Sequence, residues 1–333
     1  MLHFMMDSNE ARAPAIRVVG GVTLDAIIRP DGTPLVGLLG GNALWASAGS
    51  VAAGGAPAIH GVVGQEYPAE ALAAIEAAGV DITNIARRQG PTARVTFSYS
   101  ADGAREQPAN RERVAELEAR VRGEFLDTTR DEKIRFAALP DAGSLNVDVD
   151  NSNWHLGLLP VRRFAELVDA LEGADYLQAD CPARFEMSPL KFSELEPAFS
   201  ALDVFLPSTS DFDVMAPGED PLVITRKLHE AGAEVIVLKC GADGAVLSEK
   251  GSMWHLPAWT HTGGGDPTGA GDVFCGAFAC AVLRGDSLVR AAAFASAYAS
   301  LALETNYPLD VAVHGGGRVD QRAAVIEKDV KKL

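Results

Sequence analysis

The chain has few cysteines, no long apolar run and no sign of an export signal. Its 333 residues include only 4 cysteines, at 181, 240, 275 and 280, without a CxxC pair or other metal-ligand spacing. Such usage is typical of a reducing cytoplasm, where we expect the thiols to be small buried residues. No apolar run approaches the roughly 18 residues that span a bilayer, and residues 1–15 lack the pattern of a secretion signal. We therefore expect a cytoplasmic protein rather than a membrane protein or a disulfide scaffold.

Positive charge is also scarce. Lys and Arg sum to 29 against 45 Asp and Glu, which gives a formal net charge of −16. Such a surface repels phosphates at long range and argues against a broad nucleic-acid or anionic-membrane partner. Any phosphate site must therefore be built locally. The chain is 47% apolar and 22% charged, which predicts a globular protein with a substantial core.

Apolar β-rich runs alternate with segments of helical period, the pattern of a parallel sheet with helical crossovers. The expected strands are 16–22, 57–64, 94–100, 176–181, 203–206, 234–240 and 245–248. The expected helices are 44–53, 68–78, 111–126, 161–171, 222–231, 270–283 and 288–303. We expect one α/β domain over residues 1–333.

Residues 90–155 depart from this alternation. Val95, Phe97 and Tyr99 alternate with Thr96 and Ser98, which predicts a strand with one solvated face. A helical pattern follows, and we expect a small lid subdomain over the main sheet. The pattern of residues from about 107 to 153 assigns them no role. They could enlarge the lid, mediate a dimer contact, or be mobile when no substrate is bound.

A glycine-rich stretch over residues 262–272 runs into an apolar helix that we expect to begin at Ala270. Glycines let the backbone turn tightly, and the N–H groups at a helix start attract anions. Asp272 would be unfavourable beside a bound phosphate, yet it could accept a proton from a hydroxyl aligned to attack that phosphate. The alternative is an ordinary loop in which Asp272 caps the helix.

Neither common nucleotide loop is present. The sequence G-x-x-x-x-G-K-[ST] does not occur, and the glycines of residues 262–272 do not fit G-x-G-x-x-G. These mismatches disfavour a P-loop NTPase and an ordinary dinucleotide dehydrogenase.

Residues 266–274, Asp-Pro-Thr-Gly-Ala-Gly-Asp-Val-Phe, resemble the D-T-T-G-A-G-D-x-F signature of the ribokinase-like, or PfkB-type, carbohydrate kinase family, with Pro267 replacing one Thr. The sequence Gly40-Gly41-Asn42 is similar to a second signature of that family. Weaker matches follow in the family's order at residues 21–25, 63–64, 79–81 and 237–244. The resemblance implies a ribokinase-like three-layer α/β/α fold, with a mostly parallel central sheet and a small β lid.

The resemblance also implies an activity: ATP-dependent transfer of the γ-phosphoryl group to a hydroxymethyl group of a sugar or sugar-like molecule. The implied catalytic residues are Asp272 as general base and Gly269, Ala270 and Gly271 as an anion hole. The implied acceptor-binding residues are Asp25, Gly40, Gly41, Asn42 and Arg105. The implied ATP-binding residues are Lys239, Gly241, Gly244 and Thr268. By resemblance the lid could also form a homodimer.

The implied metal sites are less well matched. Where the family carries N-x-x-E, this chain has Ser208 and Asp211, so Asp211 would reach Mg²⁺ through water with a shorter side chain. Asp266 matches the position near which family members bind a monovalent cation, which implies K⁺.

Three alternatives stay open from the sequence. Trp45 could stack on a sugar or base, or it could be a core residue. The acceptor could be a nucleoside, as in an adenosine-type kinase. The altered Ser208 and Asp211 motif and the long insert also suit a non-catalytic ligand sensor that kept the kinase fold.

Overall fold

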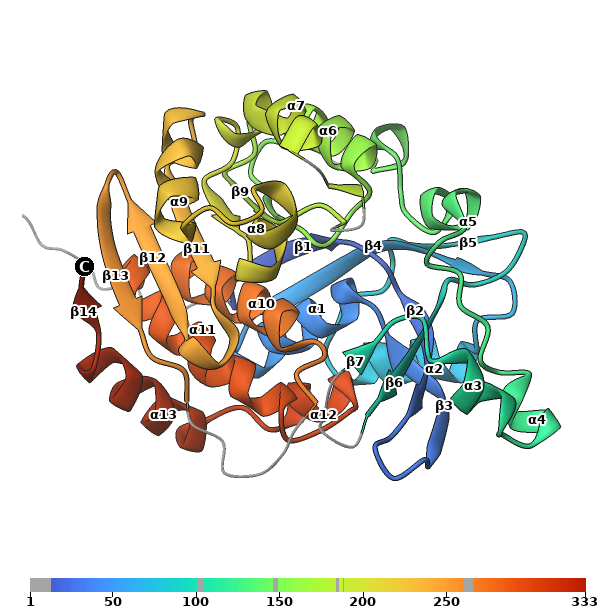
Figure 1. Cartoon of the computed structure of the whole chain (residues 1–333). Coiled ribbons are helices and arrows are strands. Elements are labelled where there is room, and N and C mark those ends of the chain that lie inside the picture. Colours follow the sequence, from blue (N-terminus) through green and yellow to red (C-terminus); the bar gives the residue numbers. More distant parts are fainter. Residues whose placement is uncertain (1–12, 101–104, 146–148, 184–185, 188, 260–265) are drawn as a thin grey trace, which may run out of the picture.

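The computed structural model describes residues 13–100, 105–145, 149–183, 186–187, 189–259 and 266–333. Their strands form a large central sheet and a smaller sheet beside it (Figure 1). Across these residues, no helix is both long enough and apolar enough to cross a membrane.

The central sheet is mostly parallel. Its strands, in chain order, are β1 (Ala15–Val19), β4 (Ala56–Gly64), β5 (Ile85–Arg88), β8 (Asn153–Leu156), β9 (Tyr176–Asp180), β10 (Val204–Leu206), β11 (Val235–Lys239), β12 (Ala245–Glu249), β13 (Ser252–Leu256) and β14 (Lys331–Lys332). In space they run β14-β13-β12-β11-β10-β9-β8-β1-β4-β5, with antiparallel pairing only from β11 to β14. The chain leaves β1 towards β4 and returns to β8 on the other side. Carboxyl ends of strands near such a reversal commonly border a ligand crevice.

The smaller sheet is the lid. Its strands are β2 (Thr23–Ile28), β3 (Pro34–Gly40), β6 (Arg94–Tyr99) and β7 (Arg105–Glu106), in the order β3-β2-β6-β7. Two of its strands therefore come from the segment between β1 and the first helix, which the sequence pattern did not predict. The predicted strand 16–22 ends early, at Val19, and the chain passes directly into the lid.

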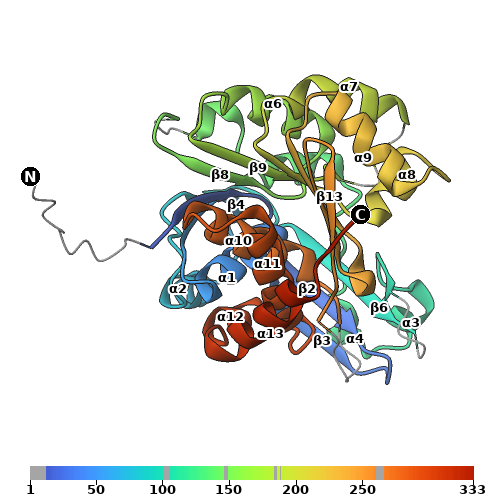
Figure 2. The ribbon, with the colours of Figure 1, turned by 90° about the vertical axis from the view of Figure 1, so that its left-hand side faces the viewer.

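Helices cover both faces of the central sheet (Figure 2). One face carries α1 (Asn42–Ala52), α2 (Ala69–Ala77), α10 (Ala270–Leu283), α11 (Leu288–Ala302), α12 (Pro308–Val313) and α13 (Gly317–Lys328). The other face carries α6 (Val161–Ala170), α7 (Pro189–Phe199), α8 (Thr209–Met215) and α9 (Pro221–Glu230). A separate apolar cluster fills the space on each face. This is the expected three-layer α/β/α arrangement.

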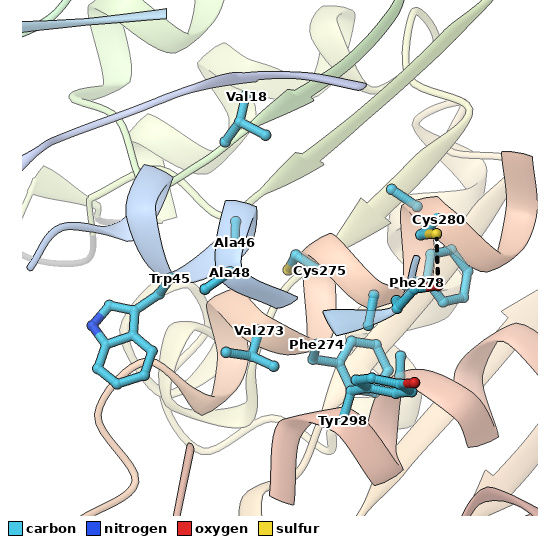
Figure 3. Packing of buried hydrophobic residues seen from close by; sticks show 14 of the residues in the cluster. Val18, Trp45, Ala46, Ala48, Val273, Phe274, Cys275, Phe278, Cys280 and Tyr298 are labelled. Carbon is cyan, nitrogen blue, oxygen red and sulfur yellow. Dashed lines mark hydrogen bonds between the residues drawn. The ribbon is translucent and has the colours of Figure 1, made fainter. Parts of the chain in front are cut away.

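Small residues let the helices that matter for the site pack closely. Ala46 and Ala48 of α1 belong to the same apolar cluster as Val273 and Phe274 of α10 (Figure 3). The predicted helix 270–283 is confirmed with the same bounds. Because α10 begins where the glycine-rich stretch ends, this packing fixes the position of that turn.

Two predictions for the insert region were wrong. The expected helix 111–126 splits into α3 (Arg111–Ala115) and α4 (Ala119–Arg122), because Glu118 between them has extended φ and ψ of −55° and 144°. A third short helix, α5 (Glu132–Ala137), follows. The supposedly solvated side of β6 is also buried, with Thr96 and Ser98 only 2% and 1% exposed.

The insert accounts for that burial. The backbone amide of Ala109 donates to Thr96 Oγ1 at 3.0 Å, and that of Asn110 donates to Ser98 Oγ at 2.9 Å. Further along, Asp127 Oδ2 accepts the backbone amide of Thr96 at 2.8 Å. The insert therefore covers the outer side of β6 and satisfies its polar groups within the same chain.

Candidate active site

The alternating faces of β9 and β11 bring polar groups to α10. Side chains two residues apart in a strand share a face, so Tyr176, Gln178 and Asp180 point towards α10. Gln178 Nε2 donates to the carbonyl of Cys275 in α10 at 2.9 Å. At the carboxyl end of β11, Lys239 Nζ donates to Asp180 Oδ2 at 2.8 Å. The site therefore rests on a buried ion pair that spans β10.

A cleft of about 800 Å³ opens above this pair. Its polar lining comes from the strand ends and from the start of α10, including Asp180, Ser208, Asp211, Lys239 and Asp272. Its apolar lining comes from Ala258, Trp259, Phe274, Ala299 and Leu303. Gly241, Gly244 and Gly271 line it as well. Predicted ATP-site residues and the predicted base thus share one cavity.

Asp272 lies half-buried in the first turn of α10. Burial, reinforced by the nearby Asp180 carboxylate, raises the pKa of Asp272 to about 7 against the lowering effect of Lys239 and Arg105. Within the described residues, the N-cap of α10 is Gly269, with no side-chain capping bond. The alternative in which Asp272 merely caps its helix therefore has no support in the geometry.

The turn before α10 presents its amides unequally. The amide of Ala270 donates to the carbonyl of Pro267 at 3.1 Å, so it is already engaged. Gly271 lies in the first helical turn, where the helix has no carbonyl for its amide. Gly269 has φ of +82°, and an added Cβ would lie 2.2 Å from the Trp45 ring. Trp45 is 4% exposed and supports this turn from below, which favours the core interpretation of that residue.

Asp25 occupies a second buried position, in lid strand β2. It accepts a hydrogen bond from Thr23 Oγ1 at 2.6 Å, and burial raises its pKa to about 7. The Asp25 carboxylate lies against Gly40 of β3, the residue paired with Thr23: a Cβ added to Gly40 would lie 2.0 Å from Asp25 Oδ2. Glycine at position 40 therefore makes room for the carboxylate.

Asn42 is used by the fold. Its Oδ1 accepts the amides of Gly21 at 2.7 Å and Ala43 at 2.9 Å, and its Nδ2 donates to the carbonyl of Leu158 at 2.9 Å. The Gly40-Gly41-Asn42 motif thus joins the end of β3, the turn after β1 and the loop after β8. Acceptor contact by Asn42 stays a prediction.

Thr268 and Arg105 lie on the lid side of the turn, away from the large cleft. Thr268 Oγ1 is 2.9 Å from Tyr99 Oη and accepts from Arg105 Nη1 at 3.1 Å. Thr268 also borders a small pocket of about 10 Å³, together with Asp25, Ile27, Leu38, Leu39, Trp45, Asp266 and Asn306. The predicted ATP contact of Thr268 therefore has no geometric support here, while Asp25 and the turn do meet at one pocket.

Asp211 lies in the first turn of α8. Its Oδ2 accepts the backbone amide of Ser208 at 2.8 Å and the Ser208 hydroxyl at 2.6 Å, forming a capping box. The Asp211 side chain borders the cleft. A carboxylate there suits Mg²⁺, which prefers oxygen ligands and is often held by one or two carboxylates plus substrate phosphates. Among the described residues, no group of three or more His, Cys, Asp or Glu could hold a metal by itself.

Sequence reasoning missed Asp180, Tyr99 and Asn306. Asp180 ends a parallel strand, and the rule that ligands bind outside the carboxyl ends of such strands could have identified it. Tyr99 and Asn306 carry no such signal. Residues 262–265 and the lid tip 102–104, parts of the predicted motifs, lie outside the described residues.

The start of a long helix, a half-buried carboxylate in its first turn and a cleft of about 800 Å³ beside it are features expected of an α/β phosphotransferase. Residues 175–310 match a protein-family model described as "pfkB family carbohydrate kinase". A cytidine kinase from Thermococcus kodakarensis is 26% identical over 274 residues, which cover 81% of this chain and 89% of that protein.

Two solved structures show the same fold. Ribokinase from Arabidopsis thaliana, complexed with ribose and ATP, has a TM-score of 0.65 at 20% identity, covering 95% of this chain and 99% of its own. A structure from Escherichia coli in complex with ATP and Mg²⁺ has a TM-score of 0.64 at 18% identity, with coverage of 95% and 99%. Residues 175–310 therefore match the PfkB family of carbohydrate kinases, and the chain has a ribokinase-like fold. The match and the cytidine kinase similarity indicate an ATP-dependent kinase of sugars or nucleosides, a phosphotransferase with an alcohol acceptor.

Proposed function

We propose that this kinase phosphorylates a hydroxymethyl group of a sugar or sugar-like molecule, with Asp272 as general base. The observation that supports it is the position of two aspartates, Asp25 buried and Asp272 half-buried, near one turn. Asp272 lines the large cleft, and Asp25 borders the small pocket that also touches Thr268. A hydroxyl held near the turn would therefore reach both a base and the nucleotide.

ATP occupies the large cleft in this proposal. The apolar wall that includes Trp259 and Leu303 would contact the adenine ring of ATP, and the phosphates would approach Gly271 and Lys239. The N-terminal end of α10 adds a partial positive charge that favours the phosphates in this acidic protein. Lys239 contributes as one half of its ion pair with Asp180, so its charge is partly compensated.

Asp272 takes the proton of the attacking hydroxyl. Its pKa of about 7 is close to neutral pH, so a large share of Asp272 is ionised while the carboxylate is still basic enough to take a proton. The amide of Gly271 stabilises charge on the transferred phosphoryl group. Mg²⁺ would be held in part by Asp211 and would neutralise charge on the phosphates of ATP.

Asp25 binds hydroxyl groups of the acceptor. A carboxylate can accept two hydrogen bonds and is suited to a pair of neighbouring hydroxyls. Thr23 orients it, and Gly40 lets it lie against backbone. A nucleoside acceptor is the second candidate, because the cytidine kinase similarity extends over 81% of this chain.

The test is an ATP-consumption screen over sugars, sugar acids and nucleosides with Mg²⁺, run in parallel on the wild type and on Asp272→Asn. Asp320→Asn, an exposed change on α13, is the matched control. We expect turnover with a sugar-like acceptor in the wild type and the control only. Ligand binding without product for every acceptor would instead identify a sensor, and exclusive turnover of nucleosides would identify a nucleoside kinase.

A further inference from the structure

The carboxylate of Asp266 accepts three hydrogen bonds from the protein. Tyr99 Oη donates to Oδ1 at 2.5 Å, and the backbone amide of Thr268 donates to the same oxygen at 2.9 Å. Asn306 Nδ2 donates to Oδ2 at 3.0 Å. These donors come from the lid, from the turn itself and from the segment after α11. Asp266 therefore joins three segments that are distant in sequence.

The orientation of the Asn306 amide is set independently. Its Oδ1 accepts from Arg29 Nη2 at 3.3 Å, so its nitrogen is the atom that faces Asp266. The amide consequently offers Asp266 a donor and leaves no oxygen on that side for a cation.

These donors leave little room for a monovalent cation. A carboxylate has about four lone-pair positions, and three of them here face N–H or O–H hydrogens. A cation bound to the same oxygens would lie close to the positive ends of those bonds. The residues around Asp266 therefore do not fit the K⁺ site that the family resemblance implied.

The backbone of Tyr99 is held in place by the insert. Tyr99 is 5% exposed, and its backbone carbonyl accepts from Arg113 Nη1 of the insert. The same guanidinium donates through Nη2 to the carbonyl of Arg29 at 2.7 Å. The insert thus braces the lid strand at the residue that reaches the turn.

We propose that Tyr99 and Asn306 replace a bound monovalent cation at Asp266, and that Tyr99 is a positioning residue for the Gly269–Asp272 turn. Phosphoryl transfer is then independent of K⁺. This inference rests on the proposed function for its kinetic part, because the turn matters only if it holds the phosphoryl group.

The first experiment needs no acceptor. Thermal unfolding of the wild type is measured in KCl and in tetramethylammonium chloride at equal ionic strength. We expect the two midpoints to agree within about 1 °C, because a cation that does not bind the native state cannot stabilise it. A K⁺-specific rise in the midpoint that Asp266→Asn abolishes would overturn the inference, whatever the outcome of the acceptor screen.

The second experiment uses the acceptor found in the screen. Tyr99→Phe removes one hydroxyl and keeps the ring, and Tyr307→Phe is the control because Tyr307 is exposed. We expect Tyr99→Phe to lower kcat by about tenfold or more with the KM for ATP within about threefold, since misplacing reacting groups slows the chemical step. Combining it with Asn306→Ala should make turnover respond to K⁺ but not to tetramethylammonium.

Two kinetic outcomes would contradict the positioning role. One is a kcat for Tyr99→Phe within about twofold of the control. The other is a wild-type kcat that rises severalfold on adding K⁺ at constant ionic strength. Either would leave the kinase assignment standing, because each is measured on an active enzyme.

Discussion

Asp25 and Asp272 are both aspartates whose pKa is raised by burial to about 7, yet they face spaces of very different size. Asp272 opens on a cleft of about 800 Å³, whereas Asp25 borders a pocket of about 10 Å³. In the proposed function, the nucleotide side is therefore already formed. The acceptor side is narrow, and side chains there would have to shift before a sugar could enter.

The difference separates two uses of the same side chain. Asp25 is held by Thr23 and packed against Gly40, which suits recognition of a fixed arrangement of hydroxyls. Asp272 stands on the first turn of a helix beside an ion pair, which suits proton transfer. Variants at the two positions should therefore fail in different ways.

The largest effect is expected for Asp272→Asn. An amide cannot take the hydroxyl proton, so kcat should fall by about 10² to 10⁴, the range that a general base contributes. The KM for the acceptor should stay within about threefold. Steady-state kinetics beside Asp320→Asn measures this, and near-normal kcat in Asp272→Asn would remove the base role.

Asp25→Asn should act mainly on acceptor binding. Loss of the charged acceptor of hydrogen bonds should raise the KM for the sugar by about 10-fold to 100-fold, given roughly 1.5–3 kcal/mol for a hydrogen bond to a charged group. The KM for ATP should not change, because Asp25 lies outside the large cleft. If both KM values rose together, the two regions would not be separate sites.

Asp180→Asn should shift the pH dependence of kcat. Asp180 raises the pKa of Asp272 and Lys239 lowers it, so removing the Asp180 charge leaves the lysine uncompensated. The acid limb of the kcat profile should then move to lower pH by about one unit. Adding Lys239→Met should move the acid limb back towards higher pH. A limb at the same pH in both variants would show that Asp272 is not the group that titrates there.

The smallest effect concerns stability. The folded-state pKa values of Asp25 and Asp272 lie above those of an unfolded chain, so the folded state binds more protons between about pH 4 and pH 7 and stability falls as pH rises through that window. Asp25→Asn should therefore be more stable than the wild type at pH 8, by about 2 kcal/mol, and closest to it near pH 4. Urea unfolding at both pH values checks the sign, and a destabilised variant at pH 8 would show that Asp25 is not strained by burial.

Local patterns predicted much of this molecule, and contacts between distant residues account for what they missed. Helix 270–283 could be placed because a glycine turn is followed by an unbroken apolar run. The prediction for Lys239 lacked its ion-pair partner, because Asp180 lies 59 residues away in the sequence. The link from Tyr99 to Asp266 spans 167 residues, and neither residue differs locally from an ordinary strand or loop residue.

The insert shows the same limit in another way. Alternation in β6 is a sound indication of one polar face, but whether water or protein meets that face depends on residues 109–128. The alternation predicts that Thr96 and Ser98 are solvated, whereas the insert covers them.

The indole of Trp45 lies against Gly269, so the turn that would hold the phosphates carries its own optical label. Because the chain has only 4 tryptophans, replacing the other three with phenylalanine would leave a single emitter beside that turn. Its fluorescence would then follow nucleotide arrival in real time without any attached dye.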